Sequence, residues 1–330
     1  MIQEDMPTYD TIEPQTNNSG ALTTKDVKSL VSEGKFTWQV VIMLVIIILA
    51  WSTPNVIGRY LHNTSTFLPI QISALRYLPA AITLILFCLA SKRGMQLIID
   101  LKEKWYHLLI ASAILTSFVL FQMYSVTLTN ASVSSFLLNV NPVITFGLSF
   151  IILKERHRWW GSLGVLIAAC GIFFIAIPLD DISSLFTGSF DVVLGNILAF
   201  LSGFMWAVYS IYLKKFLKDR DPITITTWNL SFSAIILIIA MFIIEGWFIS
   251  PVYYYHFITT TFMGVVPTAI AFTLWFETIR RISVQKASVF QFLIPVIASL
   301  FAIAMGEFPN WSFGLGGGLI LIGLIITQFS

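Results

Sequence analysis

An all-α integral membrane protein with ten transmembrane helices, arranged as two inverted five-helix repeats, is the architecture we predict for this chain. The composition, the spacing of the apolar runs and the distribution of basic residues all support it. The 330 residues are 57% hydrophobic and 11% charged, with a mean hydropathy of +0.84. A soluble domain carries about 25% charged residues to cover its surface. A chain this poor in charge would expose large apolar patches in water, so we expect most of its surface to face lipid.

Residues 1–35 differ from the rest of the chain and are predicted to form a disordered cytoplasmic tail. Too few of them are apolar to bury a core. We do not expect a signal peptide, because the first apolar run begins only near Phe36 and the region before it is acidic. The acidic residues of the tail are Glu4, Asp5, Asp10, Glu13, Asp26 and Glu33.

Beyond residue 36, apolar runs of about 20 residues alternate with short polar breaks. An α-helix rises about 1.5 Å per residue, so such a run crosses a hydrocarbon core of about 30 Å. Helices also satisfy their backbone hydrogen bonds internally, as lipid requires. The predicted spans cover residues 38–60, 67–90, 105–126, 131–153, 159–178, 192–213, 222–244, 252–279, 286–306 and 311–329.

The basic residues favour this number of spans and indicate a topology. Lys and Arg concentrate in cytoplasmic loops. With the N-terminus inside, all of the 19 Lys and Arg residues except Arg59 and Arg76 fall on the cytoplasmic side. The outer segments carry acids instead, among them Asp180, Glu245 and Glu307. We therefore expect a multi-pass protein of a plasma or inner membrane with both termini in the cytoplasm.

An internal repeat relates the two halves of the chain. Aligning Pro69 with Pro222 also places Pro142 over Pro295. Each half contains five predicted spans, an odd number, so the second half crosses the membrane in the opposite sense to the first. Inverted repeats of this kind are typical of secondary transporters. The predicted divisions are a first repeat at 36–178, an outer linker at 179–191 and a second repeat at 192–330.

Short motifs in both halves resemble a known family. Ala50-Trp51-Ser52 and Ala74-Leu75-Arg76-Tyr77 are similar to motifs of the EamA domain, which belongs to the drug/metabolite transporter superfamily. The resemblance covers residues 38–329. It implies ten helices with a central cavity lined by spans 1, 3, 4, 6, 8 and 9, while spans 5 and 10 pack as scaffold. Further matching segments are Ser125–Ala131, Ser134 to Pro142, Lys154-Glu155 and, less faithfully, Ser288 to Pro295 and Gly306-Glu307.

Pro142 and Pro295 lie near the middle of the fourth and ninth spans and are candidate hinges. Proline has no backbone N–H, so each one leaves a carbonyl without its usual helical donor, at Leu138 and at Gln291. Their matching positions in the two halves favour a hinge beside the substrate site. A passive kink is the alternative.

Amide and aromatic side chains near midspan are the candidate substrate-binding groups. Amides at membrane depth also bond to neighbouring helices, and aromatic rings also pack against lipid, so both alternatives stay open. Tryptophans at the span ends are typical of interfacial anchors and are not included. The candidates are Trp51, Asn55, Gln122, Tyr124, Asn139, Asn141, Trp206, Tyr209, Trp275 and Gln291.

Arg76 is the only cation well inside a predicted span and Glu277 is the only acid inside one, and both are candidates for charge coupling. A buried arginine needs an anion or carbonyl partner, so Arg76 holds either a substrate carboxylate or a structural bond to a neighbouring helix. Glu277 precedes Arg280 and Arg281 at ion-pair spacing on one helix face. A salt bridge near the cytoplasmic end is therefore the alternative to a proton-coupling role.

The expected function is a secondary transporter that moves small organic metabolites by alternating access. Amino acids or related solutes lead as substrates by the family resemblance alone, and a channel or facilitator pore for small solutes is the alternative. We expect no enzymatic activity, no cofactor and no metal site, because the spans contain no HExxH, paired aspartates or serine–histidine set. The expected partners are a small-molecule substrate and the lipid bilayer, without nucleic acid. Glycines such as those at Gly314–Gly318 are expected to pack helices within one chain or across a homodimer.

Overall fold

Polar breaks and prolines divide the chain into helices that follow the predicted runs. The computed structural model describes residues 37–54, 57, 61, 67–129, 131–155, 159–176, 189–246, 253–304 and 311–328, and their regular structure is entirely helical. The predicted tail at 1–35 and most of the outer linker lie outside the described residues. The helices of the first half are α2 (Trp38–Trp51), α4 (Pro69–Ala90), α5 (Gly94–Leu128), α6 (Ala131–Leu138), α7 (Asn141–Leu148), the π-helical η1 (Ser149–Leu153) and α8 (Trp159–Ala176).

The second half also contains both long and broken helices. Its helices are α9 (Phe190–Phe216), α10 (Pro222–Ala240), the π-helical η3 (Met241–Glu245), α11 (Tyr254–Gly264), the π-helical η4 (Val265–Ile270), α12 (Ala271–Arg281), α13 (Val284–Val289), the 3₁₀ turn η5 (Phe290–Phe292), α14 (Leu293–Ala304) and α15 (Trp311–Gln328).

Among the described residues, six helices are long and apolar enough to cross a membrane. They are Pro69–Ala90, Gly94–Leu128, Val133–Leu153, Phe190–Phe216, Pro222–Glu245 and Tyr254–Arg281. Shorter apolar helices occupy Trp38–Trp51, Trp159–Phe174, Val284–Ala298 and Gly314–Thr327. Every predicted span therefore overlaps an apolar helix of the described residues, and the prediction of a helical chain with several membrane-length segments is confirmed.

The third helix begins earlier than predicted. We expected it from residue 105, but α5 begins at Gly94 and runs through the lysines that were assigned to a loop. Two acids in the added turns, Asp100 and Glu103, both form ion pairs with Arg220, which follows α9. These ion pairs stabilise helical turns that hydropathy alone predicts to be a loop in water.

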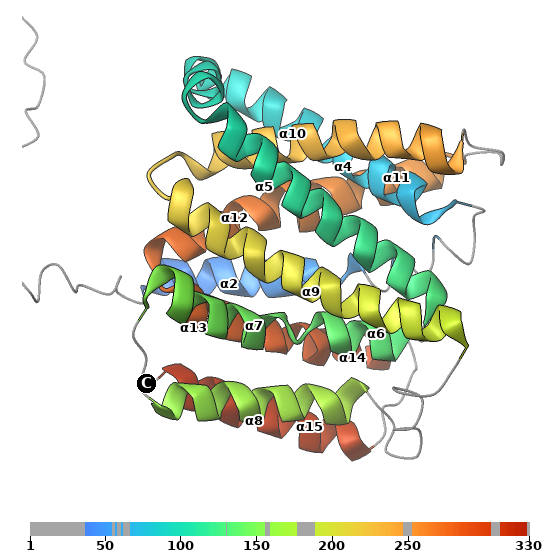
Figure 1. Ribbon diagram of the computed structural model, residues 1–330, viewed down its shortest axis with the longest axis vertical. Helices are drawn as coiled ribbons and strands as arrows, with labels where there is room; N and C mark the ends of the chain where they lie inside the picture. The colour runs from blue at the N-terminus through green and yellow to red at the C-terminus, as the bar shows by residue number, and fades with distance from the viewer. Residues whose placement is uncertain are drawn as a thin grey trace, which may run out of the picture. The chain divides into compact units, whose positions relative to one another are not determined.

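Helices from the first half of the chain pack against helices from the second half (Figure 1). The extensive pairs are α4 with α10, α5 with α9, and α8 with α15, and α2 packs against α12. The main core cluster joins α2, α4, α5, α9, α10 and α12, with fully buried side chains at Tyr77, Leu108, Leu230 and Phe276. A smaller cluster that includes Phe146, Ile172, Phe292 and Ile320 ties α8 and α15 to the broken helices.

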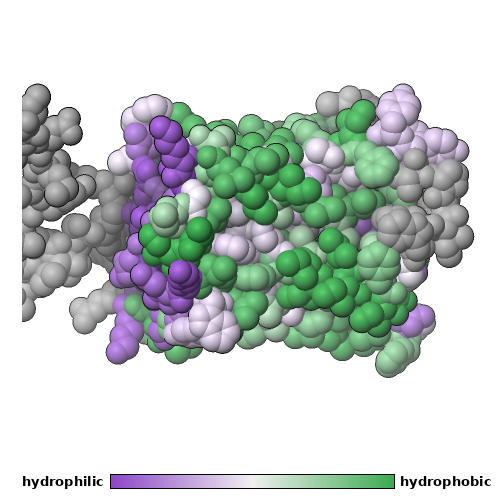
Figure 2. Space-filling view, turned by 90° about the horizontal axis from the view of Figure 1, so that it is seen from above, coloured by the Kyte–Doolittle hydropathy of each residue, from purple (hydrophilic) through white to green (hydrophobic). Residues whose placement is uncertain are grey.

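The outer surface of the bundle is apolar. Large hydrophobic side chains are exposed on many helices, with Ile151 at 71% and Ile243 at 78% of their full accessibility. Figure 2 shows hydrophobic residues across the middle of the face in view and hydrophilic residues gathered at one end. Water would not support so large an apolar surface, so this distribution matches helices surrounded by lipid with polar ends.

Glycines allow α8 and α15 to approach at backbone distance. A Cβ atom added at Gly171 would lie 2.5 Å from the carbonyl oxygen of Gly316, and Gly164 and Gly323 meet in the same way. Close approach of small residues is a main source of helix association in lipid. Around Gly314, Gly317 and Gly318, by contrast, no atom of the described residues lies within 4 Å of an added Cβ.

We therefore expect Gly171→Ala to destabilise the bundle by about 1–3 kcal/mol, because the added methyl group forces two backbones apart. Thermal unfolding of the purified protein in detergent measures this. Gly318→Ala is the matched control and should leave the unfolding midpoint unchanged. Equal unfolding midpoints for the two variants would show that the α8–α15 contact does not require glycine at position 171.

Candidate functional site

The first helix break lies between α6 and α7. Pro142 is the second residue of α7 and cannot donate a backbone hydrogen bond to the carbonyl of Leu138. The side chain of Asn141 replaces that donor, with Nδ2 at 3.1 Å from the Leu138 oxygen. On the other side, Gly203 of α9 packs so close that an added Cβ would lie 2.7 Å from the same oxygen. The break is thus held by one amide and by one closely packed neighbouring helix.

The second break precedes Pro295, where the 3₁₀ turn η5 separates α13 from α14. Gln291 lies in this turn, and its Oε1 accepts a hydrogen bond of 3.1 Å from Trp206 Nε1. One turn further on, the carbonyl of Ile294 accepts a bond of 3.2 Å from Ser52 Oγ. Side chains of α9 and of the chain just after α2 therefore meet at this break.

The third break is the π-helical segment η4, between α11 and α12. Pro267 deprives the carbonyl of Met263 of its helical donor, and Thr268 Oγ1 donates to that oxygen at 2.8 Å instead. The carbonyl of Pro267 accepts a bond of 3.0 Å from Trp51 Nε1. π-Helical segments are rare and often lie at functional sites. The sequence analysis did not predict this break, although a proline inside an apolar run, Pro267, is a signal for it.

The first two breaks line a cavity of about 580 Å³, a volume that includes its open mouth. Trp51 and Arg76, which bond to Pro267 and Thr268 of the third break, also line it. Its wall combines aromatic rings, side-chain amides and one cation. The lining residues are Trp51, Pro54, Arg76, Phe118, Gln122, Leu138, Asn139, Asn141, Trp206, Phe272, Gln291 and Ile294. This mixture of apolar wall and few polar groups is typical of a small-molecule site.

Two polar atoms in the cavity wall have no hydrogen-bond partner among the described residues. They are the acceptor Asn141 Oδ1 and the donor Gln291 Nε2, and both are buried. Asn139 differs, because its Nδ2 folds back on its own helix and donates to the carbonyl of Ser135 at 2.7 Å. A buried amide atom without a partner costs about 1–3 kcal/mol, so a bound polar molecule would stabilise this wall.

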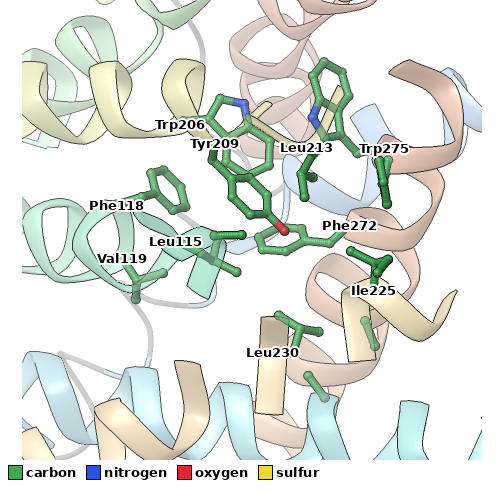
Figure 3. Packing of buried hydrophobic residues seen from close by; sticks show 14 of the residues in the cluster. Leu115, Phe118, Val119, Trp206, Tyr209, Leu213, Ile225, Leu230, Phe272 and Trp275 are labelled. Atoms are coloured by element: carbon green, nitrogen blue, oxygen red, sulfur yellow. The ribbon is translucent and has the colours of Figure 1, made fainter. Parts of the chain in front are cut away.

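Aromatic rings form one side of the cavity, and Figure 3 shows three of them, Phe118, Trp206 and Phe272, close together. The rings of Trp51 and Trp206 meet edge to face with centroids 5.1 Å apart, and Phe272 lies 5.4 Å from Trp206. Trp275 packs behind them, 5.5 Å from Trp51, and its Nε1 donates to Ser210 Oγ at 3.0 Å. Tyr209 is also fully buried there. These rings close off one end of the cavity.

The structure brings most of the candidate substrate-binding residues together. Trp51, Gln122, Asn139, Asn141, Trp206 and Gln291 line the cavity. Tyr209 and Trp275 belong to the packed aromatic layer behind it, and Tyr124 packs against the main core cluster. Asn55 lies outside the described residues. The sequence analysis did not single out Pro54, Phe118, Leu138, Phe272 or Ile294, because apolar side chains carry no signal that separates a cavity wall from a lipid-facing surface.

The two charged candidates have different surroundings. Arg76 is 6% exposed, lines the cavity and donates from Nε to Thr268 Oγ1 at 2.6 Å. Among the described residues, no carboxylate lies within ion-pair distance of it. Glu277 accepts hydrogen bonds from Arg280 at 3.1 Å and from Arg281 at 2.5 Å and does not line the cavity.

A second polar cluster closes the bundle beyond the aromatic layer. Glu155, which follows η1, lies 3.3 Å from Lys214 Nζ and accepts a bond of 3.2 Å from the backbone N–H of Val284. Lys214 also donates to the carbonyl of Ile282 at 2.5 Å. A carboxylate is stabilised at a helix N-terminus, here that of α13, by the unpaired backbone N–H groups.

The described residues contain no group of His, Cys, Asp and Glu side chains that could hold a metal ion.

The chain is similar in sequence to several proteins that are named as transporters. The chain is 22% identical over 290 residues to an uncharacterized transporter of Clostridium kluyveri, covering 88% of this chain and 93% of that protein. It is 24% identical over 193 residues to the uncharacterized transporter YyaM of Bacillus subtilis. That match covers 58% of this chain and only 62% of YyaM.

Two further similarities concern a named exporter and a solved fold. A probable terminal-alkyne amino-acid exporter of Streptantibioticus cattleyicolor is 25% identical over 200 residues, covering 60% of this chain and 64% of that protein. A protein of known crystal structure has the same fold, with a TM-score of 0.74 at 20% identity over 88% of this chain and 96% of that one.

The model of the EamA-like transporter family matches residues 38–177 and 193–329. These segments include every helix that lines the cavity. The lining comes from spans 1, 3, 4, 6, 8 and 9, as the resemblance implied, but also from the second span, α4, which contributes Arg76. The match extends over nearly the whole described chain. This chain therefore belongs to the EamA-like transporter family.

Proposed function

We propose that the protein is a secondary transporter that moves small organic solutes, with amino acids or related compounds as the leading class, by alternating access. In this proposal ten helices form two inverted five-helix repeats around the cavity. The observation that carries it is the cavity itself, with one buried unpaired acceptor, Asn141 Oδ1, and one buried unpaired donor, Gln291 Nε2, at two helix breaks. The amino-acid exporter among the relatives supports the substrate class.

The pattern of helix contacts supports the inverted repeat. If the halves are exchanged, the pairs α4–α10 and α8–α15 each map onto themselves, while α5–α9 maps onto α12–α2. An approximate twofold axis between the halves produces this pattern. The two segments that match the family model also coincide with the predicted repeats at 36–178 and 192–330.

The two ends of the cavity support alternating access. At one end, the aromatic layer and the contact of Glu155 with Lys214 and α13 close the bundle. In the proposal, the other end of the cavity, towards Pro54 and Gln122, is the open one. The breaks at Pro142 and Pro295 lie between these ends and offer the positions where α6–α7 and α13–α14 can bend. Rocking of the halves about them would close the open end and open the closed one.

Counterflow separates this proposal from a channel. Proteoliposomes containing the purified protein and loaded with unlabelled amino acids should transiently accumulate labelled amino acid from outside, because a carrier exchanges its solute one for one. A pore only equilibrates the label. Uptake that follows the gradient without saturation or overshoot would favour the channel or facilitator.

We expect Gln291→Leu to weaken solute binding by about tenfold, because it removes the free donor and leaves Trp206 Nε1 without its acceptor. The concentration dependence of counterflow measures the change. Gln39→Leu is the control, since Gln39 bonds to Arg281 at 2.8 Å away from the cavity. If both variants transport with the wild-type affinity, the cavity wall at Gln291 does not bind the solute.

The proposed topology places both termini in the cytoplasm. In a chain whose free cysteines, Cys88 and Cys170, are replaced by alanine, Thr129→Cys and Gly246→Cys should react with a membrane-impermeant maleimide on intact cells. Ser91→Cys and Lys218→Cys should react only after permeabilisation. Labelling of Gly246→Cys and Ser91→Cys from the same side would contradict the proposed order of spans.

A further inference from the structure

We propose that the cavity selects solutes that bear a carboxylate, with Arg76 as the residue that binds the anion and Thr268 as its positioning residue. This inference rests on the proposed transport function and names the chemical group that the site recognises. It comes from the surroundings of Arg76 and from the π-helical segment η4, neither of which is explained by helix packing alone.

Arg76 is a buried cation, and the described residues supply no anion to compensate it. Of the described residues that line the cavity it alone is charged, it is 6% exposed, and no described carboxylate lies within ion-pair distance. An isolated charge inside a membrane protein is costly and needs a partner. The other contact that the structure gives it is weak, with its guanidinium carbon 5.7 Å from the ring centre of Tyr77. A solute anion in the cavity would supply the missing charge.

Thr268 fixes the direction of the guanidinium. Its hydroxyl proton is committed to the carbonyl of Met263, which Pro267 leaves without a backbone donor, so its oxygen is free to accept from Arg76 Nε. Gly264 lets α11 approach the same turn of α4, because an added Cβ would lie 2.5 Å from the carbonyl oxygen of Arg76. Both ends of the arginine, backbone and Nε, are therefore held by the α11–η4 segment.

The geometry leaves the terminal guanidinium nitrogens for a ligand. Among the described residues, Nε is the guanidinium nitrogen with a hydrogen-bond partner, and the two terminal nitrogens have none. This fork binds a carboxylate through two parallel hydrogen bonds. A phosphate dianion would bring a second charge that no other lining residue offsets. The unpaired acceptor Asn141 Oδ1 could receive an amino or hydroxyl group of the same solute.

Matched ligands test the inference on the full-length purified protein. Thermal shifts are measured with L-phenylalanine and 3-phenylpropanoate, which carry the carboxylate, and with L-phenylalaninamide and phenethylamine, which lack it. Corresponding leucine and alanine series follow. We expect the acids to bind at least about tenfold more tightly than the amides, as charge-assisted bonds predict. Equal binding of acids and amides, or no binding of any carboxylate, would overturn the inference. Counterflow of an amine in that case would leave the transport proposal standing.

Variants separate positioning from stability. Thr268→Val removes the hydroxyl at nearly constant shape and should reduce the acid-to-amide affinity ratio by about tenfold, whereas Thr268→Ser keeps the hydroxyl and should retain the ratio. Arg76→Gln should abolish the preference. A merely structural role of Thr268 would lower the affinities for acid and amide equally. That result, or an unchanged ratio in folded Thr268→Val, would refute its assignment as the positioning residue.

Discussion

Hydrocarbon offers no hydrogen-bond partner to a backbone group, and this constraint determines where the polar side chains of the bundle lie. Pro142 leaves the carbonyl of Leu138 without a donor, and Asn141 supplies one. Pro267 does the same to Met263, and Thr268 supplies the replacement. Each break in a helix therefore brings a polar side chain to membrane depth. Asn141 also lines the cavity, so at least this polar group of its wall follows from the need to satisfy the interrupted backbone.

Trp51 and its neighbour Ser52 connect the breaks to one another. The indole donates to the carbonyl of Pro267 in η4 and packs edge to face on Trp206, which in turn donates to Gln291 in η5. Ser52 donates to the carbonyl of Ile294 beside Pro295. A bend at either broken helix must change one of these contacts. The end of α2 thus provides a direct physical connection between the two breaks at which the helices would bend in the proposed alternating access.

Local properties of the chain could be predicted from the sequence, and properties that depend on distant partners could not. Apolar run length and the missing N–H of Pro142 and Pro295 are visible in the sequence, and the structure has helices and breaks at those positions. The role of Thr268 depends on Arg76 in another helix and left no local signal. The face that each helix turns to the cavity was also hidden, because helices surrounded by lipid are apolar on all sides. Trp275, predicted in the cavity, packs behind it for this reason.

The two ends of the α4–α10 pair are held by different interactions, although the proposed twofold axis relates the two helices. At one end, both carboxylate oxygens of Glu245 accept bonds of 2.9 Å from the backbone N–H groups of Ile70 and Gln71. At the other, Asp221 caps α10 and lies 3.0 Å from Arg93, with side chains 27% and 38% exposed. Salt screens an exposed ion pair more than a carboxylate seated on a helix N-terminus. The two ends are therefore held by interactions of different kinds, and ionic strength acts mainly on the end at Arg93.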